Sequence, residues 1–173
     1  MGGYIALETC STYPEKVEAL SLVHSVASAD SEEMQHKRQK SIDLIKKGGK
    51  ISLLNEMIGN LFTEKFKKNQ AAVIDGLKAE SAQLDDEVLI AFTTAMKNRK
   101  EHLDTIANAE IPIQWILGEE DALMPKEKIL NQAILCLRPE ISILKNVGHM
   151  GMLEDFKELV FKLKKFVNYA SNS

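Results

Sequence analysis

The sequence predicts an α/β protein in which about three parallel strands carry flanking helices and a helical insertion. Three short apolar runs bounded by chain-breaking residues predict the strands. Amphipathic segments after the second and third runs predict helices that return the chain to the same sheet. A long stretch of helical periodicity between the first and second runs predicts the insertion. The 173 residues have the size of one ordinary domain.

The predicted strands are residues 17–23, 113–117 and 140–144. The second run is introduced by Pro112 and ended by Gly118. All three are rich in residues that favour strands, and none is long enough for a free-standing helix. Three parallel strands make a thin sheet, because parallel sheets usually contain more strands and are covered on both faces. We therefore expect the chain to be the later part of a larger fold.

Two amphipathic helices are predicted around the third strand. Residues 126–137 place one apolar stripe behind Pro125, a residue that favours a helix start. The last segment begins with Glu154 and Asp155 and carries lysines toward its end, which suits the helix dipole. Its apolar stripe comprises Phe156, Leu159, Val160, Leu163, Phe166 and Val167.

The stretch between the first two strands is too long for a simple crossover, which needs about a dozen residues. It carries helical periodicity in several pieces, with Gly48 and Gly49 between the first ones. We expect residues 1–29 to form the first part of the core, residues 30–83 a helical lid, and residues 84–173 the rest of the core.

Composition excludes several classes of protein. Twenty-two Lys and Arg against 25 Asp and Glu give a net charge of −3, which argues against a nucleic-acid partner. No apolar stretch approaches the length of a membrane span, and the start has no signal-peptide pattern. The isolated Cys10 and Cys136 are predicted to be reduced, buried thiols, which favours a cytoplasmic location.

An acid and a histidine follow the second and third predicted strands. Asp121 closes the turn that begins at Gly118, and His149 lies in the loop after residues 140–144. The carboxyl ends of parallel strands meet at one edge of a sheet, where ligands bind. The two side chains are therefore predicted to form an acid–base pair in which the carboxylate fixes the imidazole tautomer. A nucleophile is missing from this pair.

The other polar candidates receive plainer interpretations. Ser25 is predicted to line a pocket floor, and His24 to pack or form a hydrogen bond on the opposite face of the strand. His36 and His102 lie in polar helical contexts and are predicted at the surface, as are Glu119 and Glu120. No two histidines have metal-ligand spacing, so we assign no metal and no cofactor.

The beginning of the chain resembles the segment after the nucleophile elbow of α/β-hydrolases. Met1-Gly2-Gly3-Tyr4 is the common continuation of that elbow, and Tyr13-Pro14 and an apolar strand follow. Gly-x-x-Asp before Pro125 and the run from Gly148 to Glu154 resemble the acid and histidine loops of the same family. The resemblance covers essentially the whole chain, and its pieces occur in family order.

The resemblance implies a partial α/β-hydrolase fold and specific roles. His149 would be the general base, Asp121 the orienting acid, and the Met1 backbone N–H an oxyanion donor. The nucleophile, by resemblance a serine, would lie just upstream of Met1. Some relatives keep the acid after the preceding strand, which makes Asp30 the competing residue. Residues 30–83 would be the cap domain common in this family.

Three functions remain open. The first is a serine hydrolase of small ester or related acyl substrates. The second is a non-catalytic fragment or pseudo-enzyme that acts as a binding module, self-associates, or pairs with a missing N-terminal half. The third is a self-contained domain that binds a ligand under its lid, which would unfold cooperatively on its own.

Overall fold

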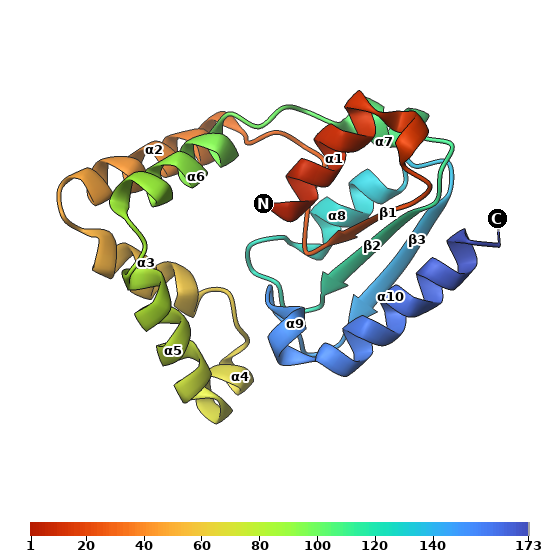
Figure 1. The fold of residues 1–173 in the computed structure, drawn as a ribbon. Helices are drawn as coiled ribbons and strands as arrows, with labels where there is room; N and C mark the ends of the chain where they lie inside the picture. Colours follow the sequence, from red (N-terminus) through yellow and green to blue (C-terminus); the bar gives the residue numbers. More distant parts are fainter. Residues whose placement is uncertain (173) are drawn as a thin grey trace. The chain divides into compact units, whose positions relative to one another are not determined.

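The computed structural model describes residues 1–172, and these form two compact units (Figure 1). The first unit, here called the sheet unit, comprises Met1–Ser28 and the chain from Glu101 onward. The second, the helical unit, is Ala29–Lys100. The helical insertion therefore separates two stretches of sequence that pack together in the sheet unit.

The sheet unit contains three parallel strands in the order β1-β2-β3. They are β1 (Leu20–Val23), β2 (Ile113–Gly118) and β3 (Pro139–Leu144). This confirms the predicted fold class. The middle strand is buried along its whole length, which explains a sequence that is apolar except for Gln114.

β1 is shorter than the predicted run of residues 17–23. Pro14 opens a short 3-10 helix, η1 (Pro14–Lys16), that occupies the approach to the strand. The first residue paired with β2 is Leu20, opposite Ile113. The chain therefore enters the sheet three residues later than its apolar character suggests.

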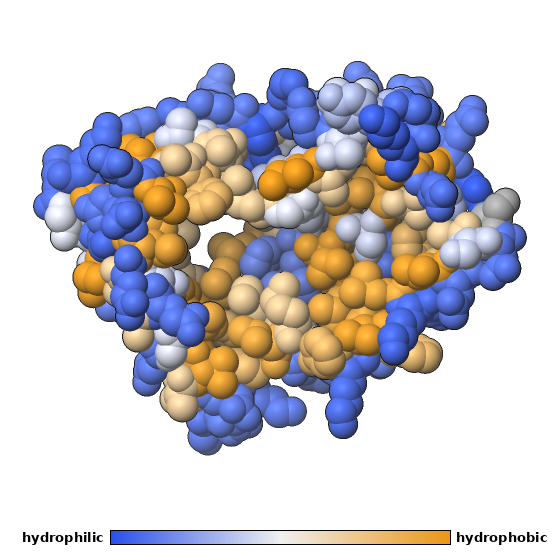
Figure 2. Space-filling model, viewed as in Figure 1, coloured by the Kyte–Doolittle hydropathy of each residue, from blue (hydrophilic) through white to orange (hydrophobic). Residues whose placement is uncertain are grey.

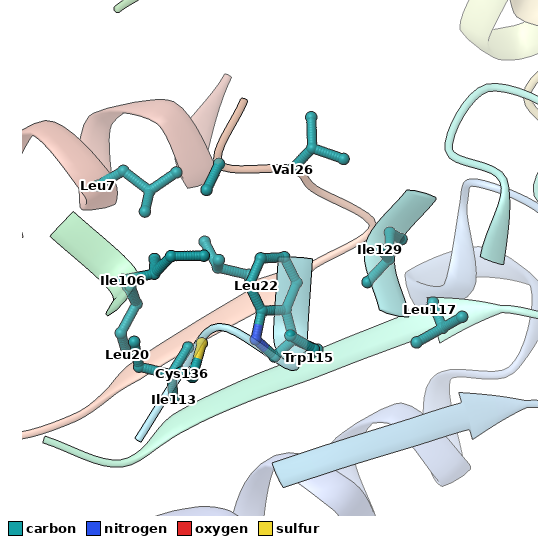
Figure 3. Close-up of a cluster of buried hydrophobic side chains, with 12 residues drawn as sticks. Leu7, Leu20, Leu22, Val26, Ile106, Ile113, Trp115, Leu117, Ile129 and Cys136 are labelled. Atoms are coloured by element: carbon teal, nitrogen blue, oxygen red, sulfur yellow. The ribbon is translucent and has the colours of Figure 1, made fainter. Parts of the chain in front are cut away.

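Helices cover both faces of this sheet (Figure 1). The chain first contributes α1 (Gly2–Thr12), α7 (Leu103–Asn108) and α8 (Lys126–Ala133). Their apolar side chains meet one face of β2 in the main core, where Leu7, Ile106 and Ile129 surround Trp115 (Figure 3). The same cluster includes Ile113 and Leu117, so alternate residues of β2 face these helices.

The opposite face is covered by α10 (Phe156–Ala170), which follows the single turn α9 (Gly151–Glu154). Ile116 of β2 packs here with Leu144 and Leu159. The side chain of Asp155 caps α10 by accepting a hydrogen bond from the backbone N–H of Glu158 at 3.1 Å. The acid predicted at the start of this helix thus lies at its cap.

The predicted helix over residues 126–137 is also shortened, because α8 ends at Ala133. Ile134 and Leu137 are 74% and 64% exposed, so the end of the predicted apolar stripe lies outside the core.

Apolar residues also reach the surface elsewhere (Figure 2). Among residues 1–172, none of the helices has the length and apolar character needed to cross a membrane.

Cys10 and Cys136 are free and buried, as the sequence predicts. Cys136 belongs to the main core beside Trp115 (Figure 3). Burial raises the pKa of both thiols. Both thiols are therefore protonated at neutral pH.

The helical unit contains five helices among the described residues: α2 (Glu32–Lys46), α3 (Lys50–Gly59), α4 (Glu64–Asn69), α5 (Ala71–Ala82) and α6 (Asp86–Lys97). The Ser31 and Thr63 side chains cap α2 and α4 by accepting hydrogen bonds from backbone N–H groups. The positions of these helices agree with the helical periodicity of this part of the sequence.

α6 lies in this unit, although the predicted lid ended at residue 83. Polar contacts hold it there. Lys50 forms an ion pair with Asp86 at 2.8 Å, and Lys97 donates to the Gln39 side chain at 2.9 Å. The unit continues to Lys100 because α6 packs along α2 (Figure 1).

Candidate active site

Asp121 lies in the loop after β2, where its carboxylate is fully buried. Its Oδ1 accepts hydrogen bonds from the backbone N–H groups of Leu123 and Met124, both at 2.9 Å. These two hydrogen bonds stabilise a local turn of the kind that an Asp side chain favours. They fix the plane of the carboxylate and leave Oδ2 for other partners.

His149 lies in the loop after β3, and its Nδ1 is 2.8 Å from Oδ2 of Asp121. An ionised carboxylate only accepts hydrogen bonds, so Nδ1 carries the proton and Nε2 is the basic nitrogen. The His149 side chain is 22% exposed, which leaves it accessible to other reactants. The acid and the histidine predicted from the two strand ends therefore lie side by side.

The two loops are packed directly against each other at Gly118, the last residue of β2. A Cβ atom on Gly118 would lie 2.2 Å from the carbonyl oxygen of Gly148 and 2.3 Å from that of Val147. The backbone N–H of Glu120 donates to Val147 O at 2.9 Å, and that of Gly148 donates to Glu154 Oε1 at 2.9 Å. These contacts set the separation of Asp121 and His149.

Opposing effects act on the ionisation of Asp121. Burial raises the pKa of its carboxyl, whereas the neighbouring rings of His149 and His24 and the backbone N–H of Met124 lower it. The lowering effects win, so the pKa lies well below its usual value and the group is a carboxylate at neutral pH. A permanent negative charge therefore faces the His149 ring.

His24 is a further member of this cluster, which the sequence pattern did not predict. β1 ends at Val23, so His24 is not a strand residue; its φ of 47° turns the chain into the following loop. Its Nδ1 lies 3.4 Å from Asp121 Oδ2, and its ring centroid is 5.6 Å from that of His149. Like Asp121 and His149, His24 directly follows a strand of the sheet. The rule that predicts those two residues therefore also applies to His24.

Ser25 is buried beside the beginning of α1. A Cβ atom on Gly3 would lie 2.2 Å from Ser25 Oγ, so the glycine permits the helix to approach this loop. Met1 precedes α1, and its carbonyl accepts hydrogen bonds from the N–H groups of Tyr4 and Ile5. The predicted pocket and oxyanion residues thus lie at the start of α1.

Asp30, the competing acid, is engaged within the helical unit. Its buried carboxylate forms ion pairs with Arg38 and Arg99. These two guanidinium groups explain why a buried carboxylate is tolerated at this position. The structure therefore pairs Asp121, rather than Asp30, with His149.

The surface predictions for the remaining residues are partly correct. His36, Glu119 and Glu120 are exposed. The prediction for His102 is wrong, because its residue is only 6% exposed. Its backbone N–H donates to Ala27 O, and its Nε2 lies 3.1 Å from a carboxylate oxygen of Glu8. These contacts attach the residue before α7 to the first part of the sheet unit.

Comparison with known proteins gives structural matches only. No protein-family model matches the sequence, and no curated protein sequence does. A thermophilic esterase from Thermogutta terrifontis matches with a TM-score of 0.90 at 21% identity, over 98% of this chain and 62% of that protein. An enol-lactonase from Burkholderia xenovorans matches with a TM-score of 0.85 at 15% identity, over 97% and 63%.

An esterase from Exiguobacterium antarcticum also matches, with a TM-score of 0.81 at 16% identity, over 96% of this chain and 63% of that protein. The chain thus spans 62% to 63% of the length of these three proteins. The resemblance at this level of identity concerns the fold.

Proposed function

From the partial α/β-hydrolase fold of this chain, we propose that it carries the acid and base of a serine hydrolase acting on small ester or related acyl substrates. His149 is the general base, and Asp121 orients its ring and stabilises its protonated form. The serine nucleophile occupies the position before Met1 in the elbow sequence. The 2.8 Å contact between His149 Nδ1 and Asp121 Oδ2 carries this proposal.

The proposed reaction follows from the tautomer of His149. Its Nε2 accepts the serine proton while the serine oxygen attacks the acyl carbon. The Asp121 carboxylate stabilises the imidazolium that forms, and His149 then returns the proton to the leaving group. In the second half of the reaction, His149 takes a proton from water while the water oxygen attacks the acyl-enzyme. The bond to the serine oxygen then breaks, His149 returns the proton to that oxygen, and the acid is released.

Three further roles belong to the same proposal. The backbone N–H of Met1 would be an oxyanion donor, because it lies at the start of α1, where the helix dipole favours negative charge. Ser25 would line the acyl pocket. The helical unit would act as the cap that selects the substrate. The esterase and lactonase names of the structural neighbours support an acyl substrate.

Hydrolysis of 4-nitrophenyl acetate tests this proposal. It is measured on the 173-residue chain and on the longest in-frame chain that contains it. Turnover above background is expected only where a serine precedes Met1, and His149→Ala should abolish it. His36→Ala, which alters an exposed histidine, is the matched control and should retain full turnover. Turnover that survives His149→Ala would overturn the proposal.

The open edge of β1 supports a second candidate function, that of a binding module. Within residues 1–172, β1 pairs with β2 alone. The backbone N–H groups of Leu20 and His24 donate toward β2, so the groups of Ser21 and Val23 face the unpaired side. An unpaired strand edge favours association with another strand, here a second copy of the chain or residues upstream of Met1.

Sedimentation velocity over a range of concentrations tests this second function. Reversible self-association of the 173-residue chain would support pairing between copies. Association that disappears in the longer chain would support pairing with upstream residues. A monomer at every concentration would contradict both.

A further inference from the structure

We propose that His24, Asp121 and His149 form a binding site for one Zn²⁺ ion. A ring nitrogen from each histidine and a carboxylate oxygen of Asp121 lie within 4.8 Å of one another. Two imidazoles and a carboxylate are ligands that zinc uses, and three protein ligands leave its fourth position open. Mg²⁺ and Ca²⁺ prefer sites made of oxygen atoms, so this ligand set selects a transition metal.

The His24 ring is the independent observation that points to a ligand. Its side chain is 2% exposed, and neither ring nitrogen has a hydrogen-bond partner within residues 1–172. The 3.4 Å between its Nδ1 and Asp121 Oδ2 is too long for an ordinary hydrogen bond. A buried unpaired polar group is costly, and binding a metal at Nδ1 would give that atom a partner.

The surroundings hold the three ligands in place. A Cβ atom on Gly151 would lie 2.5 Å from His24 Nε2, so the absence of a side chain there makes room for the ring. The backbone N–H groups of Leu123 and Met124 fix the other oxygen of Asp121. Such outer contacts orient metal ligands and raise the affinity of a site.

Two of the three ligand separations are close to those that zinc requires, and the ring nitrogens of the two histidines lie no more than 4.8 Å apart. Tetrahedral ligands about 2.0–2.1 Å from zinc lie about 3.3 Å from one another. The His24–Asp121 separation of 3.4 Å already matches this value. The His149–Asp121 separation of 2.8 Å must lengthen by about 0.5 Å, which replaces their hydrogen bond by two bonds to the metal.

Metal binding would have a chemical consequence that rests on the proposed function. Zinc on His149 Nδ1 requires the single proton of the neutral ring to move from Nδ1 to Nε2. Nε2 can then no longer accept a proton from a serine. Zinc binding and general-base catalysis are therefore mutually exclusive, and zinc is a reversible inhibitor of the proposed hydrolase.

A competition titration of the tag-free, metal-free chain with ZnCl₂ and a chromophoric chelator tests the site. One zinc per chain is expected. His24→Phe should weaken binding by about 100-fold or more, above the roughly 10–100-fold loss caused by changing an outer contact. His36→Phe is the matched control on an exposed helix and should bind as the unaltered chain does.

A second variant guards against loss of folding. His149→Phe changes a side chain that is 22% exposed, and it should also lose zinc while its circular dichroism stays unchanged. Zinc should raise the Tm of the unaltered chain and of His36→Phe alone. Unchanged affinity in folded His24→Phe or His149→Phe would overturn the site, as would binding that depends on Cys10 or Cys136.

The two proposals fail in different ways. Zinc binding by the 173-residue chain, together with a longer chain that has no esterase activity, would contradict the hydrolase and leave the metal site standing. Esterase activity that depends on His149, with no zinc binding, would contradict the metal site alone.

Discussion

Replacing Gly118 by alanine perturbs the contact that sets the candidate site. The new Cβ atom would lie 2.2 Å from Gly148 O and 2.3 Å from Val147 O, distances that no real Cβ atom adopts. Both obstacles are backbone atoms, so the histidine loop must move away from β2. Val147 O also accepts the hydrogen bond from the Glu120 N–H, which this movement breaks.

The magnitude follows from three contributions. Overpacking costs about 1–3 kcal/mol, and losing the hydrogen bond costs about 1 kcal/mol. Alanine reduces the entropy of the unfolded chain, which returns about 0.4–1 kcal/mol. The free energy of unfolding of the sheet unit should therefore fall by about 1–3.6 kcal/mol. At an m-value of about 2 kcal/mol/M, this is a decrease of about 0.5–2 M in the urea midpoint.

Urea unfolding followed by Trp115 fluorescence measures this change, because Trp115 is the single tryptophan and is fully buried in β2. Gly2→Ala is the matched control in the same unit, since no atom lies within 4 Å of its Cβ position. It should be neutral or slightly stabilising. A Gly118→Ala midpoint equal to that of Gly2→Ala would refute the packing argument.

Three further predictions concern charged and reactive groups. The lowered pKa of Asp121 means that its carboxylate stabilises the fold above the unfolded pKa of 3.8, and this stabilisation is lost as the pH falls further. In urea titrations, Asp121→Asn should therefore be less stable than the unaltered chain at pH 7 and approach its stability below about pH 4. A difference in stability that persists in acid would contradict this. Asp30→Asn leaves Arg38 and Arg99 without their buried partner and should cost about 3–5 kcal/mol by circular dichroism, whereas an unchanged midpoint would show that the ion pairs contribute nothing. Both cysteine thiols are buried and protonated, so 5,5′-dithiobis(2-nitrobenzoic acid) should react with them only after unfolding; rapid labelling of the native chain would contradict their burial.

The parallel sheet could be predicted because its strands are bounded by strong local signals. Pro112 and Gly118 enclose β2, whose apolar run is long enough to be buried on both faces. The start of β1 and the end of α8 differ from the prediction because the sequence pattern of each element extends beyond its packed residues. Ile134 is apolar, yet it lies 74% exposed in the turn after α8.

The acid–histidine pair could also be predicted, since it depends only on which residues follow neighbouring parallel strands. The third member, His24, differs from its prediction because strand alternation does not extend past the end of β1 at Val23. A positive φ at His24 breaks that alternation and directs the ring toward Asp121. The burial of His102 depends on Glu8 and Ala27, which are distant in sequence, so local context could not reveal it.

The central claim is that Asp121 holds His149 with its proton on Nδ1 and its basic nitrogen at Nε2. A long-range ¹H–¹⁵N correlation spectrum of the histidine side chains at neutral pH measures this tautomer directly, with His149→Phe to assign the signals. We expect His149 as the Nδ1–H tautomer in the metal-free chain, and the loss of that preference in Asp121→Asn. A His149 ring protonated on Nε2, or one that Asp121→Asn leaves unchanged, would contradict the account.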